Sequence, residues 1–114
     1  MRSLQFLVLR CRDLEAARRF YECFEMTFTK HAHGAGPEHY AHEDERGVFE
    51  LYPAGEGAPA EATGLGFAAA DLSAVREQLA RLGLAPQPIR QQPWGRTFVV
   101  RDPDGRRVEV KKNE

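Results

Sequence analysis

The chain contains few cysteines and no long apolar run. These two absences argue against a disulfide-rich protein and against a protein with a membrane-spanning helix. Its 114 residues contain two cysteines, Cys11 and Cys23, which form no CxxC pair and are too few for a disulfide framework. We therefore expect two reduced thiols in a cytoplasmic protein. No apolar stretch reaches the roughly 18 residues that a membrane helix needs. The stretch at residues 6–11 is short and contains Arg10, so we expect no signal peptide either.

The chain also lacks an excess of charge of either sign. Its 16 basic and 17 acidic residues are mixed along the sequence, and the formal net charge is −1. A nucleic-acid surface needs a net basic face, so we expect no nucleic-acid partner. Serine is scarce, at positions 3 and 73 only, and neither a Gly-x-Ser-x-Gly elbow nor a phosphate-binding loop occurs. The sequence thus offers no obvious nucleophile.

What the chain does contain is an internal repeat. Asp13-Leu14 and Asp71-Leu72 each follow a short apolar run, and an alanine and an arginine follow each pair at matching positions. Residues 47–51 and 106–110 match at nearly the same offset, which is about half the chain. Several matches in the same order indicate two copies of one structural unit.

Within each copy the pattern predicts a strand, a helix and three further strands. Asp13 and Asp71 are good N-caps, because a carboxylate accepts hydrogen bonds from the free N–H groups of a first helical turn. Apolar residues then recur at helical spacing, and Gly83 suits the end of the second helix. The predicted strands are residues 6–9, 27–30, 39–42 and 48–52 in the first copy and 65–69, 86–89, 97–101 and 108–111 in the second.

The two copies define the expected organisation of the chain. Residues 1–54 form the first βαβββ module and residues 64–114 the second, within one structural domain. Residues 55–63 are rich in Pro, Gly and Ala and form the expected linker. Asp102-Pro103-Asp104-Gly105 predicts a tight turn between the last two strands, because proline fixes φ and glycine supplies a positive φ.

Two longer stretches are similar to one known family. Residues 9–21 (LRCRDLEAARRFY) and 92–105 (QPWGRTFVVRDPDG) resemble runs of the glyoxalase/bleomycin resistance protein/dioxygenase superfamily, the second being most like its bleomycin-resistance branch. The resemblance covers nearly the whole chain. It implies the vicinal oxygen chelate fold, an α+β architecture in which tandem βαβββ modules form a curved mixed sheet around a cavity. It also implies a homodimer, with modules paired side by side or exchanged between chains.

The resemblance further implies where a metal would bind. Metal-using members take one His or Gln from the first strand of each module and one Glu from each last strand. The matching positions here are Phe6, Glu50, Gly64 and Glu109. Both first-strand ligands are absent, and neighbouring Gln5 would point to the opposite face of its strand. A divalent metal needs three or four protein ligands, so we expect no cofactor, with Glu50 and Glu109 as weak candidates for a divalent metal.

The four histidines all lie in the first half, around a glycine-rich segment. His31 with His33, and His39 with His42, could bind a metal by composition. Neither pair has a carboxylate at a recognised spacing. We therefore expect solvated histidines in a loop and on an edge strand.

The remaining candidates would line the cavity that the fold implies. Phe6, Glu50 and Glu109 would form its walls, and Gly64 would leave room for a ligand. Trp94 either packs against a planar ligand or closes the edge of the sheet, and the sequence does not decide between the two. The two glutamates either contact a cationic or hydroxylated ligand or form ion pairs with arginines nearby. The arginines available for such pairs are Arg96 and Arg107.

Two functions of different classes follow from such a site. The first is metal-independent binding of a small molecule, such as an antibiotic or a toxic metabolite. The second is a glyoxalase-like lyase or isomerase, metal-dependent or metal-free, with Glu50 or Glu109 as the catalytic base. A scaffold that only interacts with partners is also open. The near-neutral charge argues against bleomycin itself, because a cationic glycopeptide favours an acidic binder.

Overall fold

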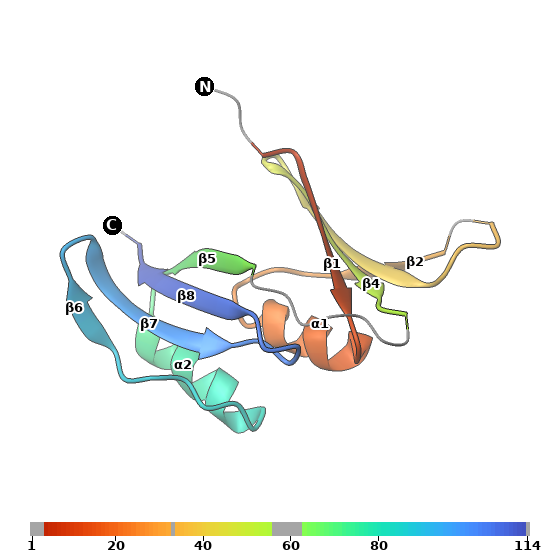
Figure 1. Ribbon diagram of the computed structural model, residues 1–114. Helices are drawn as coiled ribbons and strands as arrows, with labels where there is room; N and C mark the ends of the chain where they lie inside the picture. Colours follow the sequence, from red (N-terminus) through yellow and green to blue (C-terminus); the bar gives the residue numbers. More distant parts are fainter. Residues whose placement is uncertain (1–3, 33, 56–62, 114) are drawn as a thin grey trace.

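The element order of the computed structural model repeats once along the chain (Figure 1). The structure describes residues 4–32, 34–55 and 63–113. The first half forms β1 (Phe6–Cys11), α1 (Leu14–Glu22), β2 (Thr29–His31), β3 (His39–Asp44) and β4 (Gly47–Pro53). The second half forms β5 (Gly64–Ala69), α2 (Leu72–Arg81), β6 (Arg90–Gln92), β7 (Gly95–Arg101) and β8 (Arg107–Lys112). Both halves therefore have the predicted order β-α-β-β-β.

The two helices begin in the same way. The Oδ1 atom of Asp13 accepts a hydrogen bond from the backbone N–H of Ala16 at 3.0 Å, and Oδ1 of Asp71 accepts one from Ala74 at 3.0 Å. Each carboxylate satisfies an N–H group that the first helical turn leaves without a partner. Just after α2, Gly83 has a φ of +85°, a left-handed conformation that favours glycine. Both predicted N-caps are confirmed.

Each half of the chain forms one four-stranded mixed sheet. The strand order is β1-β4-β3-β2 in the first, sheet A, and β5-β8-β7-β6 in the second, sheet B. In both sheets the first and last strands of the module are parallel, and the other pairs are antiparallel. Figure 1 shows α1 where the two sheets meet and α2 against sheet B. This α+β arrangement of tandem βαβββ modules is the predicted fold class.

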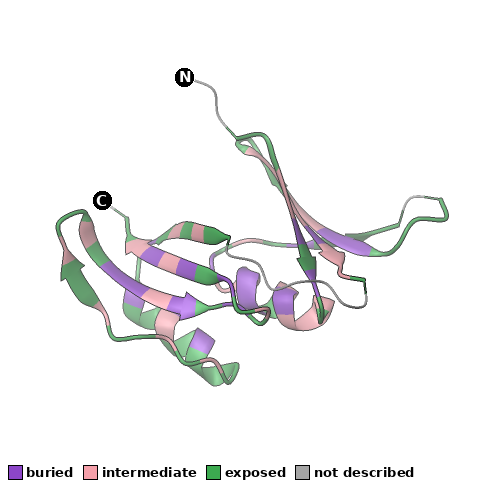
Figure 2. Ribbon diagram, viewed as in Figure 1, coloured by how far each residue is buried: buried purple, intermediate pink, exposed green. Residues whose placement is uncertain are grey.

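The apolar core lies between the sheets and the helices and joins the two modules. Buried and more exposed residues alternate along most of β8, because every second side chain points towards α2 (Figure 2). Phe24, which follows α1, stacks on Phe67 of β5 with ring centroids 4.7 Å apart. Tyr21 of α1 lies 5.8 Å from the same ring of β5 and 5.1 Å from Phe49 of β4. α1 therefore packs against both sheets.

A buried polar network also connects the modules. The guanidinium group of Arg106 is buried; it donates to the Asp102 carboxylate at 3.0 Å and to the carbonyl oxygen of Arg10 in β1. The Tyr21 hydroxyl of α1 donates to the same carboxylate at 2.6 Å, and burial raises the pKa of Tyr21. Asp102 also accepts the N–H groups of Asp104 and Arg106 at 2.9 Å each. The predicted Asp-Pro-Asp-Gly turn is thus present, and it anchors the second module to the first.

One predicted strand is wrong in position. The sequence analysis places it at residues 86–89, whereas β6 spans Arg90–Gln92. Pro86 and Pro88 have no N–H group to donate to a neighbouring strand. Two carbonyl oxygens of this segment accept hydrogen bonds from the Arg76 side chain of α2 instead. Regular pairing therefore begins only after the second proline.

The described residues leave part of the predicted organisation untested. Residues 56–62 of the predicted linker lie outside the described residues, so the division into 1–54, 55–63 and 64–114 stays a prediction. Neither helix in the described part of the chain has the length and apolar composition to cross a membrane.

Candidate ligand-binding site

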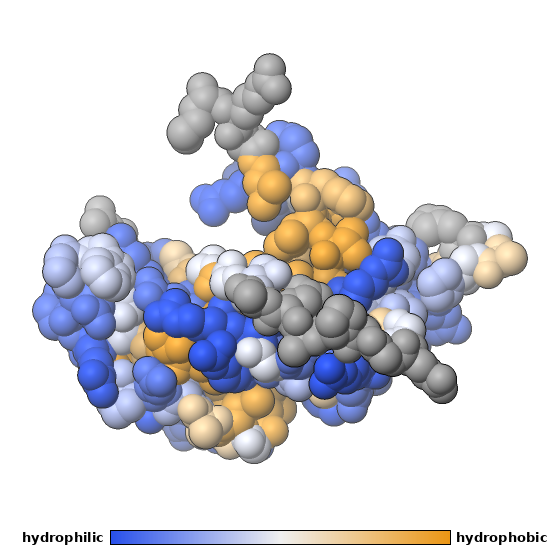
Figure 3. Space-filling model, viewed as in Figure 1, coloured by the Kyte–Doolittle hydropathy of each residue, from blue (hydrophilic) through white to orange (hydrophobic). Residues whose placement is uncertain are grey.

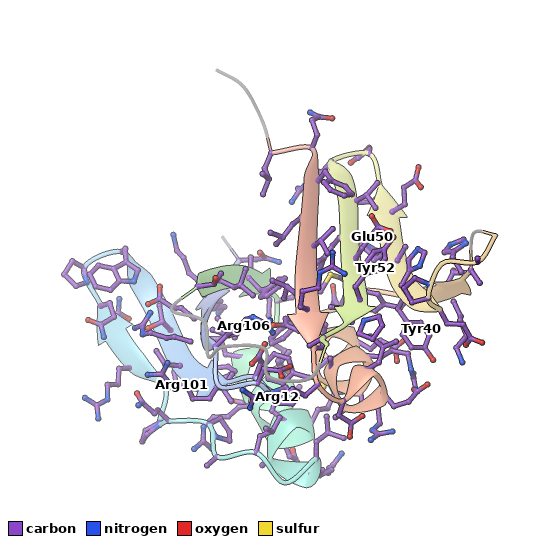
Figure 4. All side chains as sticks on the ribbon, turned by 45° about the vertical axis from the view of Figure 1, so that its right-hand side comes forward. Arg12, Tyr40, Glu50, Tyr52, Arg101 and Arg106 are labelled. Carbon is purple, nitrogen blue, oxygen red and sulfur yellow. The ribbon has the colours of Figure 1, made fainter. Side chains whose placement is uncertain are left out.

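Each sheet has one face turned away from the helix of its own module, which we call its open face. On sheet A this face carries alternate residues of β1 and β4, which lie in register: Phe6, Val8, Arg10, Val48, Glu50 and Tyr52. Figure 4 shows Glu50 and Tyr52 on this sheet and Arg101 on sheet B, with Arg106 between them. The open faces are where the sequence analysis expects a ligand.

A glutamate and a histidine face each other on the open face of sheet A. The Oε2 atom of Glu50 lies 3.3 Å from Nε2 of His39, and only 14% of the Glu50 side chain and 2% of the His39 side chain are exposed. The other ring nitrogen, Nδ1, lies 3.2 Å from the carbonyl oxygen of Pro37, which can only accept a hydrogen bond. Nδ1 is thus placed to donate to this carbonyl oxygen, and Nε2 faces the carboxylate of Glu50.

A row of stacked side chains crosses all four strands of sheet A beside this pair. The rings of His39 and Tyr52 are stacked with centroids 4.2 Å apart, and the Arg10 guanidinium lies 4.9 Å from the Tyr52 ring centroid. His31 of β2 is paired with His39, and their ring centroids are 5.9 Å apart. This row fixes the Glu50 partner in place, because His39 is packed between two aromatic rings.

The structure corrects the prediction that all the histidines are solvated. His39 is buried, and its ring contacts Tyr52, His31 and Glu50. Strand pairing explains the difference, since β3 lies between β2 and β4 and is not an edge strand. His31 is exposed, as predicted, and His33 lies outside the described residues.

On sheet B the corresponding glutamate has different partners. The indole N–H of Trp94 donates to Oε1 of Glu109 at 3.1 Å, and the Arg107 guanidinium lies 3.7 Å from Oε2. Trp94 itself is 53% exposed. The sequence analysis named an ion pair with Arg107 as one alternative for Glu109, and the structure contains it. Trp94 lies on the surface beside β6 and β7, where its indole N–H makes one hydrogen bond and its ring is exposed.

Two glycines leave the adjoining part of sheet B without side chains. Gly64 and Gly66 of β5 face the same side as Arg107 and Glu109, their register partners in β8. A Cβ atom at Gly64 would meet nothing within 4 Å, and one at Gly66 only a backbone oxygen at 3.9 Å. Neither glycine has a positive φ. Packing and backbone conformation would thus allow larger residues, and the bare strand leaves space for another molecule.

A groove opens where the two modules meet. Its volume is about 690 Å³, and both edge strands β1 and β5 line it. Much of its lining is apolar, and Figure 3 shows hydrophobic residues gathered on this part of the surface. The apolar lining includes Phe6, Leu7, Phe24, Phe49, Leu65 and Phe67. The groove is thus bordered by the face of sheet A that packs on α1 as well as by β5.

The structure brings the predicted site residues together only in part. Phe6 and Gly64 both line the groove between the modules. Trp94 and Glu109 contact each other on sheet B, whereas Glu50 lies on sheet A beside His39. Within the described residues of one chain, these three groups do not share a cavity. The sequence suggested His39 only as a possible metal ligand beside His42 and not as the partner of Glu50, although a strand period of two places it on the same face as Ala41, which is paired with Glu50.

The residues at the family's metal-ligand positions do not fit a metal ion. Phe6 and Gly64 offer no donor atom, and both carboxylates are engaged by side chains of the same chain. Among the described residues no group of three or more His, Cys, Asp or Glu side chains is placed to hold a metal. A family-type metal would therefore lack the three or four protein ligands that it needs.

The comparison with known families agrees with this architecture. The family model of the glyoxalase/bleomycin resistance protein/dioxygenase superfamily matches residues 3–110. The chain belongs to this superfamily, and its two βαβββ modules form the vicinal oxygen chelate fold. No curated protein matches the chain in sequence.

Several solved structures share the fold at low sequence identity. The antibiotic-binding protein TnmS3 from Streptomyces sp. CB03234 is 21% identical, with a TM-score of 0.77 over 100% of this chain and 98% of that one. The fosfomycin resistance protein FosX from Mesorhizobium loti is 18% identical, with a TM-score of 0.76 over 100% and 94%. Lactoylglutathione lyase from Agrobacterium tumefaciens is 20% identical, with a TM-score of 0.64 over 97% and 93%. The fold thus occurs in binding proteins, resistance proteins and lyases.

Proposed function

We propose that this protein binds a small organic molecule, such as an antibiotic or a toxic metabolite, without a metal ion. The proposal rests on one observation: the two carboxylates at the metal-ligand positions are both engaged by other side chains of the chain. Glu50 is paired with His39, and both oxygens of Glu109 are engaged, by Trp94 and by Arg107. Carboxylates held in this way serve as fixed polar groups that orient a ligand.

Exposed aromatic side chains would supply the apolar contacts. Phe6 on sheet A is 57% exposed and Trp94 on sheet B is 53% exposed. Large exposed aromatics beside a few fixed polar groups are typical of surfaces that hold a flat, partly polar ligand. The similarity in fold to an antibiotic-binding protein supports this assignment.

We also propose that the working form is a homodimer in the cytoplasm. The groove and the two edge strands that line it would be covered by a second copy of the chain. Pairing or exchange of modules would let the open face of sheet A in one protomer face sheet B of its partner, so that Glu50 and Trp94 share one cavity. Cys11 is buried, which raises the pKa of its thiol to about 12, and Cys23 is also free, as suits a reducing compartment.

Fluorescence titration tests the binding function, because Trp94 is the only tryptophan of the chain. We expect planar antibiotics of the quinolone and anthraquinone classes to quench Trp94 saturably, equally with and without EDTA. Phe6→Ala should weaken binding, whereas Leu82→Ala should not, because Leu82 is exposed beyond the end of α2. Quenching that requires an added divalent metal would contradict metal independence, and no quenching by any compound would contradict the binding function.

A lyase or isomerase is the second candidate. The arrangement that favours it is Glu50 held against His39, since a carboxylate and an imidazole side by side can serve as general base and general acid. The similarity in fold to lactoylglutathione lyase points the same way. Formation of lactoylglutathione from methylglyoxal and glutathione, lost in Glu50→Gln, would establish this activity. Saturable binding of a small molecule without any lactoylglutathione turnover would instead support the binding function.

A further inference from the structure

We propose that the open face of sheet B binds the oxyanion group of an organic ligand, a carboxylate or phosphonate, and that Arg101 and Arg107 select for it. This inference rests on the proposed small-molecule binding and names the ligand class for that site. It concerns the charge of the ligand and not its identity.

The first support is the register of charged residues across sheet B. Arg107 of β8 is paired with Gly64 on one side and with Arg101 of β7 on the other. Four residues further along β8, Lys111 is paired with Thr97, which in turn pairs with Arg90 of β6. Side chains at paired positions point to the same face of a sheet. Two cationic rows therefore flank the single row that contains Glu109.

The second support concerns which of these cationic side chains form ion pairs with a carboxylate. Among the described residues no carboxylate forms an ion pair with Arg90, Arg101 or Lys111. By contrast, the Arg18 side chain of α1 is paired with two glutamates, and Arg81 of α2 with one. Glu109 accepts a hydrogen bond from Trp94 and lies 3.7 Å from the Arg107 guanidinium, and its single negative charge offsets only part of the positive charge on this face. The open face of sheet B is thus cationic in a chain whose net charge is −1.

The third support is the space beside these cations. The side chain of Arg107 is 51% exposed, and Gly64 next to it carries no side chain. Figure 3 shows hydrophilic residues over the strands of sheet B, in contrast to the hydrophobic patch near β1. Arginine binds carboxylates and phosphonates through two parallel N–H donors, so a small oxyanion beside the bare β5 can engage both arginines. The exposed ring of Trp94 would contact the apolar part of the same ligand.

The test uses four small probes with the same phenyl ring and different charge. Phenylphosphonate and phenylacetate are anionic, 2-phenylethanol is neutral and 2-phenylethylamine is cationic. Each is titrated into the full-length ¹⁵N-labelled protein at ~150 mM NaCl, where long-range charge effects are screened. We expect the two anions to shift the backbone signals of Arg101, Arg107 and Gly64 and the Trp94 indole signal, with millimolar affinity. The alcohol and amine should bind about tenfold more weakly, and the two anions show whether one negative charge suffices.

Matched variants locate the effect. Arg101→Gln with Arg107→Gln should weaken phenylphosphonate binding about tenfold. Arg19→Gln with Arg81→Gln removes the same charge from the exposed faces of the helices, and it should change binding less than about twofold. All four arginines are exposed, so both variants should fold, as circular dichroism would check.

Each outcome separates this inference from the proposed function. Binding of the amine or alcohol at these residues as tightly as the anions would overturn the anion preference and leave small-molecule binding intact. Equal loss in both double variants would show a general charge effect and would also overturn it. If none of the four probes shifts these signals at about 20 mM, where millimolar binding saturates, the anion site is absent. Quenching of Trp94 by the antibiotics above would then still support the proposed function.

Discussion

The two modules have the same order of strands and helix, but their open faces carry different side chains. Both begin their helix with an aspartate that accepts an N–H group at 3.0 Å, and both order their strands identically. On sheet A, however, the glutamate of the last strand faces a buried histidine, whereas on sheet B it faces an exposed tryptophan and an arginine. Caps and inward-facing residues maintain the fold, so outward-facing residues are free to differ. The residues of the proposed ligand site are thus among those that differ between the two copies.

The largest loss of stability is expected at Arg106, which faces inward at the junction of the modules. Arg106→Ala leaves the Asp102 carboxylate buried without its cation. Removing one partner of a buried ion pair costs about 3–5 kcal/mol. Urea denaturation should show a loss of this size in the free energy of unfolding.

Its neighbour provides the matched control. Arg107 faces outward with a half-exposed side chain, so Arg107→Ala should change the free energy of unfolding by about 0.5 kcal/mol or less. Similar losses for the two variants would mean that inward and outward positions do not differ as described.

The two N-caps should contribute equally and more modestly. Asp13→Ala and Asp71→Ala each remove one hydrogen bond to the first turn of a helix, at a cost of about 1 kcal/mol. Asp13→Asn and Asp71→Asn retain an acceptor and should cost little. A strongly unequal loss between the two modules, measured by the same denaturation, would break the symmetry on which the comparison rests.

A small stability effect is also expected at Trp94. Because the ring is half-exposed and makes one hydrogen bond, Trp94→Ala should cost about 1 kcal/mol or less. Phe98→Ala, at a buried position of the same hairpin, should cost about 3–5 kcal/mol. The two melting temperatures check this directly. A loss at Trp94 as large as at Phe98 would identify the tryptophan as a core residue and remove it from the ligand site.

Local sequence signals are sufficient for most of the fold. Asp13 and Asp71 mark the helix starts because capping depends on neighbours within three residues. The Asp102–Gly105 turn and the last two strands are predicted for the same reason. The strand prediction at residues 86–89 is wrong because two of its residues are prolines, a local signal that was not weighed, and because the contact with Arg76 depends on tertiary structure.

The site was less predictable, because its contacts join residues far apart in the chain. Glu50 and Glu109 were named from the family resemblance, but the partner of Glu50 comes from another strand. A histidine near glycines suggests a solvated loop, and only the position of β3 inside sheet A buries His39. The role of Arg106 was missed likewise, since its partners include Arg10 at the other end of the chain.

The most direct test of metal-independent binding by a dimer is native mass spectrometry of the protein purified without chelator. Spectra would be recorded before and after excess Ni²⁺, Zn²⁺, Mn²⁺ or Fe²⁺ and then with a quenching ligand. Metal-independent binding by a dimer predicts the mass of two chains, no stoichiometric metal under any condition, and a further mass increment equal to the ligand. One metal ion per site, retained after buffer exchange, would contradict it and would make the glyoxalase-like enzyme the leading function.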